Sequence, residues 1–244
     1  MGADRLLGVL ARLAGLDGTL PSTASLCQVA TEVSGTTGAG IMLNVGDENR
    51  GTLYSSDAVS ALIEELQYTL GEGPCVDAHR LGRPVLEPDL VHAAATRWPA
   101  FTPEAVAGGA RAVFGFPLEV GSIQLGALNL YRISSGTLTD DQHADSLVVA
   151  GVIARTILSA QDASPPGELA SQLDVGANLR LVVHQASGMV SVQLGVSVSE
   201  AMVRLRAHAF RHGLSVDDVA RRVVDRTLSF DDTGEGPTTE DRHR

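Results

Sequence analysis

The run Ser164-Pro165-Pro166-Gly167 is the feature that most constrains how this chain can fold. Two consecutive prolines remove backbone donors and fix φ, so a helix that arrives at this run must end there. The residues before the run mix strand and helix periodicities, whereas the residues after it have helical periodicity alone. We therefore predict one domain at residues 20–160, a linker at 161–176 and a second domain at 177–230.

Before the break, short apolar runs separated by turn residues predict strands that pair with their neighbours. Ala112–Val120 and Ile123–Ile133 are joined by Gly121-Ser122, and Ala39–Val45 is followed by a polar turn and a return strand, as in hairpins. Helical periodicity covers residues 22–33, 57–70 and 139–158. In the last of these the repeating residues are Ala144, Leu147, Val148, Gly151, Val152, Arg155 and Leu158. Hairpins require antiparallel pairing, so we predict an α+β fold in which helices flank an antiparallel sheet.

After the break, three helical segments are separated by glycines. Gly195 and Gly213 each suit the left-handed conformation that ends a helix, and Ser197 or Ser199 and then Ser215 suit the next helix starts. Three such helices make a bundle of roughly 50 residues, which is marginally stable alone. The last 14 residues, 231–244, are acidic, and we expect a disordered tail there.

The charge is uneven along the chain. It has 29 acidic residues against 18 arginines and no lysine, a net charge of −11, but residues 177–230 hold seven arginines against four acids. The lack of lysine excludes Schiff-base chemistry and the GxxxxGK[ST] phosphate loop. A small basic region on an acidic chain allows local contact with phosphates, although such a charge is also ordinary for helix surfaces.

Enzymatic and metal chemistry find little support in the sequence. Two cysteines, Cys27 and Cys75, form no CxxC pair and no disulfide framework. No acid/base pair or nucleophile constellation is recognisable, so we expect no catalysis, no metal and no cofactor. Neither a secretion signal nor an apolar run long enough to span a membrane is visible, and we expect a cytoplasmic protein without a membrane partner.

Residues 20–160 contain a series of motifs: Leu66-Gln67, Gly71-Glu72-Gly73-Pro74-Cys75, Asp89-Leu90, Arg97-Trp98-Pro99 with Phe101, Phe116-Pro117-Leu118, and Leu125 to Tyr131. Because these motifs occur in the family order, this part of the chain shows a specific resemblance to GAF domains of actinobacterial regulators. The resemblance implies a sensor or dimerisation module with an antiparallel sheet, and it allows an unidentified small-molecule ligand. We expect Trp98 and Tyr131 to serve the core, and the apolar helix at 140–160 predicts a homodimer.

Residues 177–230 contain the run Arg180-Leu-Val-Val-His-Gln185-Ala186-Ser187-Gly188-Met189, followed by Glu200-Ala201, Leu205-Arg206, Leu214, Asp218-Val219-Ala220 and Val223-Val224. On these residues this part of the chain resembles the ANTAR domain. The family often has lysine where this chain has Ser187, so one phosphate-seeking charge is missing here. Together the two resemblances imply a transcription antiterminator that binds stem-loops in nascent mRNA, so that a terminator hairpin cannot form.

Unpaired RNA bases are read by stacking and by hydrogen bonds to their edges, and guanidinium groups suit both stacking and phosphate contact. Helical spacing predicts that Arg180, His184, Ser187 and Ser191 share a face, which the small Ala186 and Gly188 flank. Gln185 offers a donor and an acceptor to a base edge. The expected RNA-binding residues are Arg180, His184, Gln185, Ala186, Ser187, Gly188, Arg204, Arg206, Arg211, His212, Arg221 and Arg222.

Two other functions remain open at this point. Residues 198–229 form a helix, a glycine-containing turn and a helix, which superficially resembles a DNA-binding helix-turn-helix. Against DNA, the third helix begins with Asp217 and Asp218, which would face phosphates. Alternatively the bundle is a protein-interaction module, since single exposed arginines are common and Ala186 and Gly188 suit close helix packing equally well.

Overall fold

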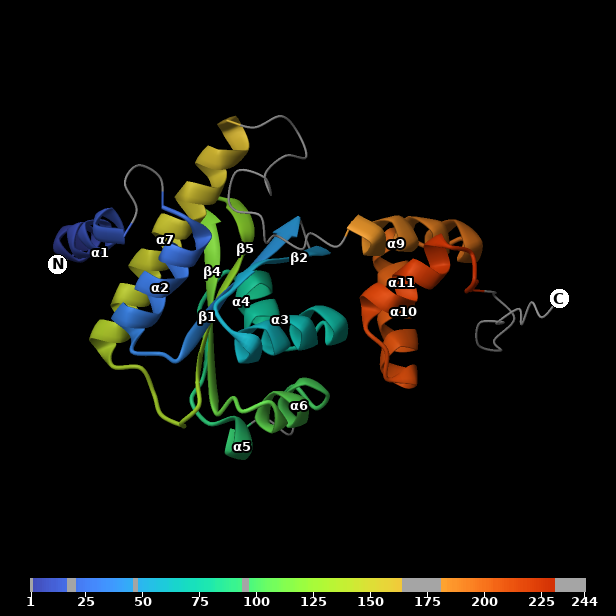
Figure 1. Ribbon diagram of the computed structural model, residues 1–244, viewed down its shortest axis with the longest axis horizontal. Coiled ribbons are helices and arrows are strands. Elements are labelled where there is room, and N and C mark those ends of the chain that lie inside the picture. The colour runs from blue at the N-terminus through green and yellow to red at the C-terminus, as the bar shows by residue number, and fades with distance from the viewer. Residues whose placement is uncertain (1, 17–20, 46–47, 94–96, 164–180, 231–244) are drawn as a thin grey trace. The chain divides into compact units, whose positions relative to one another are not determined.

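In a computed structural model the protein is described at residues 2–16, 21–45, 48–93, 97–163 and 181–230 (Figure 1). It divides into two compact units, Met1–Leu179 and Arg180–Arg244, which we call the sheet unit and the helical unit. Residues 164–176 of the expected linker and the expected tail at 231–244 lie outside the described residues. Residues 161–163, expected in the linker, belong to the last helix of the sheet unit.

The sheet unit is built on one five-stranded sheet with the order β2-β1-β5-β4-β3. Every neighbouring pair is antiparallel, so the α+β prediction is confirmed. Gly126 in β5 has φ +153, and a Cβ there would lie 1.9 Å from the Met42 carbonyl oxygen, so only glycine allows this approach of β1. The strands are β1 (Gly38–Val45), β2 (Glu48–Ser55), β3 (Val85–Glu87), β4 (Ala112–Val120) and β5 (Ile123–Arg132).

Helices cover both faces of this sheet (Figure 1). One face carries α2 (Thr23–Ser34) and α7 (Asp140–Ala163), and α1 (Gly2–Leu16) packs against both helices. The other face carries the helices α3 (Ala58–Leu70) and α4 (Pro74–Leu81), with the short α5 (Leu90–Ala93) and α6 (Phe101–Ala107) nearby. Helices α1, α4, α5 and α6 were not predicted from the sequence pattern.

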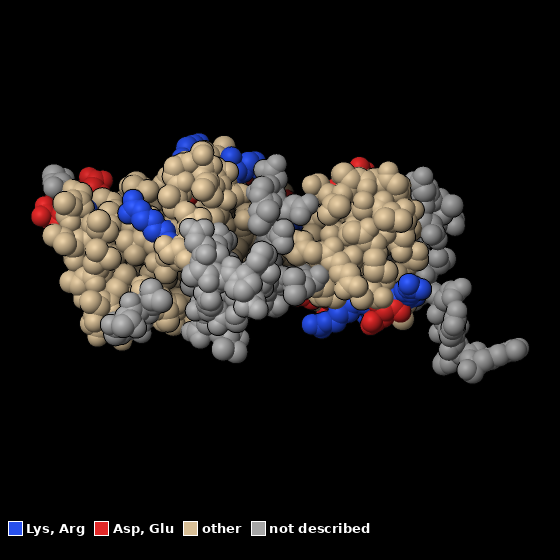
Figure 2. All heavy atoms as spheres, turned by 90° about the horizontal axis from the view of Figure 1, so that it is seen from above, with Lys and Arg blue, Asp and Glu red and all other residues tan. Residues whose placement is uncertain are grey.

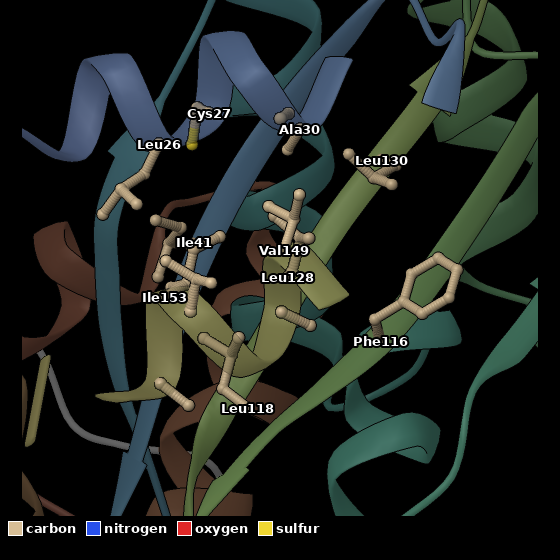
Figure 3. Packing of buried hydrophobic residues seen from close by; sticks show 14 of the residues in the cluster. Leu26, Cys27, Ala30, Ile41, Phe116, Leu118, Leu128, Leu130, Val149 and Ile153 are labelled. Atoms are coloured by element: carbon tan, nitrogen blue, oxygen red, sulfur yellow. The ribbon is translucent and has the colours of Figure 1, made fainter. Parts of the chain in front are cut away.

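The larger core lies between the sheet and α2 and α7. Figure 3 shows Leu26 and Ala30 of α2 and Val149 and Ile153 of α7 facing strand residues such as Leu128, and all of them are buried. Of the repeating residues predicted for α7, Val152 is buried and Val148 and Leu158 pack against this core. Leu147 and Arg155 are instead exposed, and Gly151 is half-buried. Both sides of this helix are apolar, so the sequence pattern does not determine which side packs.

The apolar character of α7 also bears on membrane insertion. Within the described residues, Asp140–Ala160 is the one stretch whose length and mean hydropathy of 1.2 meet the requirements of a membrane span. This differs from the sequence expectation, which found no such run. Val149, Ile153 and Ile157 on this helix are buried in the core of the sheet unit, so packing accounts for their apolar character.

On the second face, one carboxylate fixes the segment before α6. Asp77 Oδ2 accepts hydrogen bonds from Arg97 Nη2 at 3.0 Å and from the Trp98 indole at 3.1 Å, and the Arg97 guanidinium lies 4.5 Å from the Trp98 ring centroid. Trp98 and Tyr131 are both buried in the core, as predicted.

Arg132, at the end of β5, closes the end of α2. Its guanidinium donates to the carbonyl oxygens of Ser34 at 3.0 Å, Gly35 at 3.1 Å and Thr137 at 3.1 Å, and to Gln142 Oε1 at 3.1 Å. These carbonyls include ones that the helix end leaves without an intrahelical partner. This arginine is thus a structural residue of the sheet unit.

The helical unit contains α9 (Leu181–Leu194), α10 (Val198–His212) and α11 (Val216–Val224). Ser197 and Ser215 cap α10 and α11 with their hydroxyl oxygens, and Gly213 ends α10 at φ +61, as the sequence predicted. The third helix ends earlier than its apolar pattern indicated, because Arg226 has φ +58, outside helical geometry. The buried core is formed by Val183, Ala186, Val190, Ala201, Met202, Leu205, Ala209, Val216, Val219, Ala220 and Val223.

Candidate nucleic-acid interface

On α9 the structure separates the predicted site residues into an inner and an outer set. Gln185 is exposed, and a Cβ added at Gly188 would meet nothing within 4 Å, so both lie on the outer side of the helix. Gly188 therefore serves no close helix packing within the described residues. Its backbone is open to a partner, which is what contact with a base or ribose requires.

Ala186 and Ser187 belong to the inner set, and here the expected binding face is wrong. Both are fully buried, and the Ser187 hydroxyl donates to the His184 carbonyl oxygen at 2.9 Å. Buried Val183 and Val190 lie one turn before and after Ala186 and Ser187, so helical periodicity turns these side chains into the bundle. His184 is half-buried, and Arg180 lies outside the described residues.

On α10 the predicted residues differ in their surroundings. Arg204 and Arg211 are exposed, whereas Arg206 is half-buried. Arg204 pairs with Glu200 at 3.4 Å across one helical turn. Exposed pairs of this kind contribute at most about 1 kcal/mol, so Arg204 remains available to another anion.

The ends of α10 and α11 bring three predicted residues close to His208. The rings of His208 and His212 are 4.0 Å apart, and His212 Nδ1 lies 2.8 Å from the His208 carbonyl oxygen. Burial is the largest cause that lowers the pKa of His208, and the charges of His212, Arg222 and Arg211 lower it further. His208, Arg211, His212 and Arg222 therefore lie near one another, and we call them the arginine–histidine cluster, to which Arg211 and Arg222 give positive charge.

The arginine–histidine cluster is left largely unneutralised. Neither Arg211 nor Arg222 has an ion-pair partner within residues 181–230, whereas Arg221 lies 3.7 Å from Asp218. Figure 2 shows one face of the helical unit that is mostly uncharged, with arginine side chains along one edge and acidic side chains both beside them and at the opposite edge. Cations in the last turn of a helix also offset the negative end of its dipole. Such a cluster suits phosphate contact.

Phe210 on α10 was not among the predicted site residues. This side chain is exposed, although the neighbouring Ala209 is buried in the core. The sequence could have identified Phe210 as a surface residue, because its position in the helix does not fit the repeat that places Met202, Leu205 and Ala209 inward. An aromatic residue outside the core pattern of an amphipathic helix indicates a surface that can bind a partner.

The start of α11 is unsuited to phosphate. Asp217 and Asp218 lie in its first turn, and Asp218 exchanges hydrogen bonds with Ser215, whose hydroxyl accepts from the Asp218 backbone at 3.0 Å. A recognition helix of a helix-turn-helix contacts DNA with its N-terminal residues. Two carboxylates at that position oppose this geometry.

The sheet unit offers no comparable reactive site among its described residues. No group of three or more histidine, cysteine or acidic side chains could hold a metal ion there. Cys27 and Cys75 are buried, and burial, with a smaller effect of Glu64, raises the pKa of both thiols. Protonated thiols of this kind are poor nucleophiles.

The face of the sheet beneath α3 and α4 is closely packed and holds buried polar side chains among apolar ones. A Cβ at Gly40 would lie 2.5 Å from Glu64 Oε1, and one at Gly115 would lie 2.6 Å from the Pro74 carbonyl oxygen. Asn129 is buried there, and its amide makes no hydrogen bond with any described residue. Gln67 Nε2 of α3 is also buried without a hydrogen bond to any described residue, so this face holds more than one polar group that a ligand of matching polarity would satisfy.

The C-terminal part of the chain matches a known protein family. The family model of the ANTAR domain matches residues 171–224, so this part of the chain is an ANTAR domain, as the sequence resemblance indicated. The match ends with the last residue of α11. None of the curated proteins matches the sequence.

Solved structures similar to this chain include two GAF domains of phosphoenolpyruvate-protein phosphotransferases. The one from Coxiella burnetii has a TM-score of 0.49 and 16% identity, over 67% of this chain and 98% of that chain. The one from Acinetobacter has a TM-score of 0.49 and 11% identity, over 67% of this chain and 96% of that chain.

Proposed function

We propose that this chain, whose C-terminal unit is an ANTAR domain, is an RNA-binding transcription antiterminator. The helical unit binds loop bases of stem-loops in nascent mRNA, and a bound stem-loop prevents the terminator hairpin from forming. The observation that carries the proposal is the arginine–histidine cluster, which lies within the ANTAR unit and has Arg211 and Arg222 unpaired within residues 181–230.

In this proposal the two surfaces of the helical unit have different tasks. The arginine–histidine cluster contacts phosphates, and its strength falls with salt because bound phosphates release their counterions. Gln185 on the outer side of α9 contacts a base edge, and the open backbone at Gly188 admits the base or ribose. Arg180 is part of the same proposal, as the first arginine of the ANTAR motif.

A mobility-shift experiment tests the proposal. The probes are a hairpin pool with a fixed stem and a randomised loop, the enriched hairpin with its loop scrambled, and duplex DNA, each at two salt concentrations. We expect saturable binding of the enriched hairpin, weaker binding of the scrambled loop, and loss of affinity in Arg180→Ala, Gln185→Ala and Arg222→Ala. Arg83→Ala, an exposed arginine of the sheet unit, is the matched control.

Two results would contradict RNA recognition. Equal affinity for the scrambled loop would leave charge as the sole basis of binding. Tighter binding of duplex DNA would favour a DNA-binding regulator instead. A transcription assay in which the enriched hairpin overlaps a terminator should show readthrough that depends on the protein.

For the sheet unit we propose a sensory and dimerisation role of the GAF type. The unit consists of an antiparallel sheet between helices, and Asn129 on its inner face offers an unpaired amide to a small ligand. On the outer side of α1, Leu7 and Leu10 are exposed one turn apart, which suits burial against a second copy. Sedimentation of the wild type and of Leu7→Gln/Leu10→Gln tests the dimer, and a wild-type monomer would refute it.

A further inference from the structure

The outer side of α10 carries an apolar stripe that the bundle leaves uncovered. Val203, Ala207 and Phe210 follow each other at spacings of four and three, so they share one face, opposite buried Leu205 and Ala209. Phe210 is 63% exposed and Val203 is 59% exposed. We call these three residues the outer stripe.

Arginines border the outer stripe on both sides. Helical spacing places Arg206 on the side of Phe210, and Arg204 and Arg211 on the side of Ala207. The sole acidic residue of α10 is Glu200, one turn before Arg204, and Arg204 pairs with it. The stripe is thus an aromatic and aliphatic surface within a cationic frame.

We propose that an unstacked base of the RNA loop lies on the Phe210 ring, with Val203 and Ala207 completing the surface beneath it. Single-stranded nucleic acids are bound by this combination of an aromatic face for the base and cations for the backbone. Arg204 and Arg211 reach the flanking phosphates. This inference rests on the proposed function and assigns a stacking residue to it.

Charge favours a polyanion over a second copy of the chain on this surface. Three arginines against one acid on α10 would be brought together if two copies paired through their outer stripes. An RNA strand instead neutralises the same guanidinium groups with its phosphates. A single strand of RNA therefore complements both the exposed aromatic ring and the arginines that border it.

The test uses the full chain and the hairpin enriched from the randomised-loop pool, with a fluorescent adenine analogue at successive loop positions. Stacking on Phe210 should quench the analogue at one position in the wild type. Phe210→Ala should remove that quenching and weaken binding about tenfold or more. Phe210→Tyr, which keeps an aromatic face, should rescue both signals.

Val198→Ala is the matched control, because Val198 is an exposed apolar residue of the same helix, beside its acidic first turn. Its binding and quenching should equal those of the wild type. Far-UV circular dichroism of Phe210→Ala should match the wild type, since the ring is largely outside the core.

The outcomes separate this inference from the proposed function. If the wild type enriches no hairpin, the proposed function fails and the stacking role fails with it. If the wild type binds the hairpin and Phe210→Ala binds it equally well, the stacking role alone is overturned. The stacking role is likewise overturned if Phe210→Ala changes only the sedimentation coefficient, because the stripe would then be a contact between copies.

Discussion

In the sheet unit Arg132 donates to three backbone carbonyls and to Gln142, and Arg97 is held against Asp77 and Trp98. In the helical unit Arg211 and Arg222 lie beside two histidines and have no ion-pair partner within residues 181–230. Arginine thus stabilises the fold at these positions of the sheet unit, whereas the guanidinium groups of Arg211 and Arg222 in the helical unit are available to bind a partner. Arginine content alone therefore does not identify a binding surface, whereas the partners of each guanidinium do.

The largest expected effect concerns the structural arginine. Arg132→Met should lower the free energy of unfolding of the sheet unit by about 2 kcal/mol, because the half-buried Ser34 carbonyl and Gln142 lose a charged donor, as do the exposed carbonyls of Gly35 and Thr137. Urea unfolding followed by Trp98 fluorescence measures this loss. Arg155→Met, an exposed arginine on α7, should stay within about 0.5 kcal/mol of the wild type. Equal free energies of unfolding for the two variants would show that Arg132 stabilises the sheet unit no more than an exposed arginine does.

The next effect concerns the exposed arginines. Arg211→Met/Arg222→Met should leave the stability of the helical unit within about 0.5 kcal/mol. Binding of the enriched hairpin should weaken about tenfold, and the slope of log affinity against log salt should decrease by about 2. Titrations at several salt concentrations measure both. An unchanged slope would show that these guanidinium groups do not contact phosphates.

A smaller effect follows from His208. Its pKa is lowered in the folded unit by burial and by the nearby His212, Arg222 and Arg211, while Phe230 packs on its ring edge. The unfolded state then binds a proton more readily, so stability is lost as pH falls through the ordinary histidine pKa of about 6.5. Between about pH 7.5 and about pH 5.5 we expect the helical unit to lose under about 1 kcal/mol.

Amide signals of α10 and α11, followed by NMR during urea titration of the full chain, measure this pH dependence. His208→Gln should reduce the difference between the two pH values. A helical unit that becomes more stable at the lower pH would show that the sign of the shift is wrong.

The smallest effect concerns Ser187. Its hydroxyl bonds to the His184 carbonyl within its own helix, and its side chain is buried. Ser187→Ala should therefore change hairpin affinity less than about twofold and stability by less than about 0.5 kcal/mol. A loss of affinity as large as that of Gln185→Ala would show that Ser187 does contribute to RNA binding.

Features set by local chemistry could be predicted from the sequence. Gly121 turns the hairpin of β4 and β5 at φ +62, and Ser197, Ser215 and Gly213 bound the helices of the helical unit where serine and glycine chemistry places them. Each of these signals acts within a few residues of the chain.

Features set by tertiary packing could not be predicted. Helix α4 has only eight residues and begins at Pro74, so its periodicity is too short to read. In α7 and α9 apolar residues occur on more than one side, and the neighbouring elements decide which side is buried. That is why Leu147 was placed inward and Ser187 outward, and why exposed Phe210 was overlooked.

The anchoring of Trp98 by Asp77 has a practical consequence for spectroscopy. Trp98 is the only tryptophan of the chain, and Tyr54, Tyr68 and Tyr131 also belong to the sheet unit. Near-ultraviolet light is therefore absorbed and emitted almost entirely by one half of the molecule. An intrinsic fluorescence change upon adding RNA would report communication between the halves, since the fluorophore itself lies in the unit that is not proposed to touch the nucleotides.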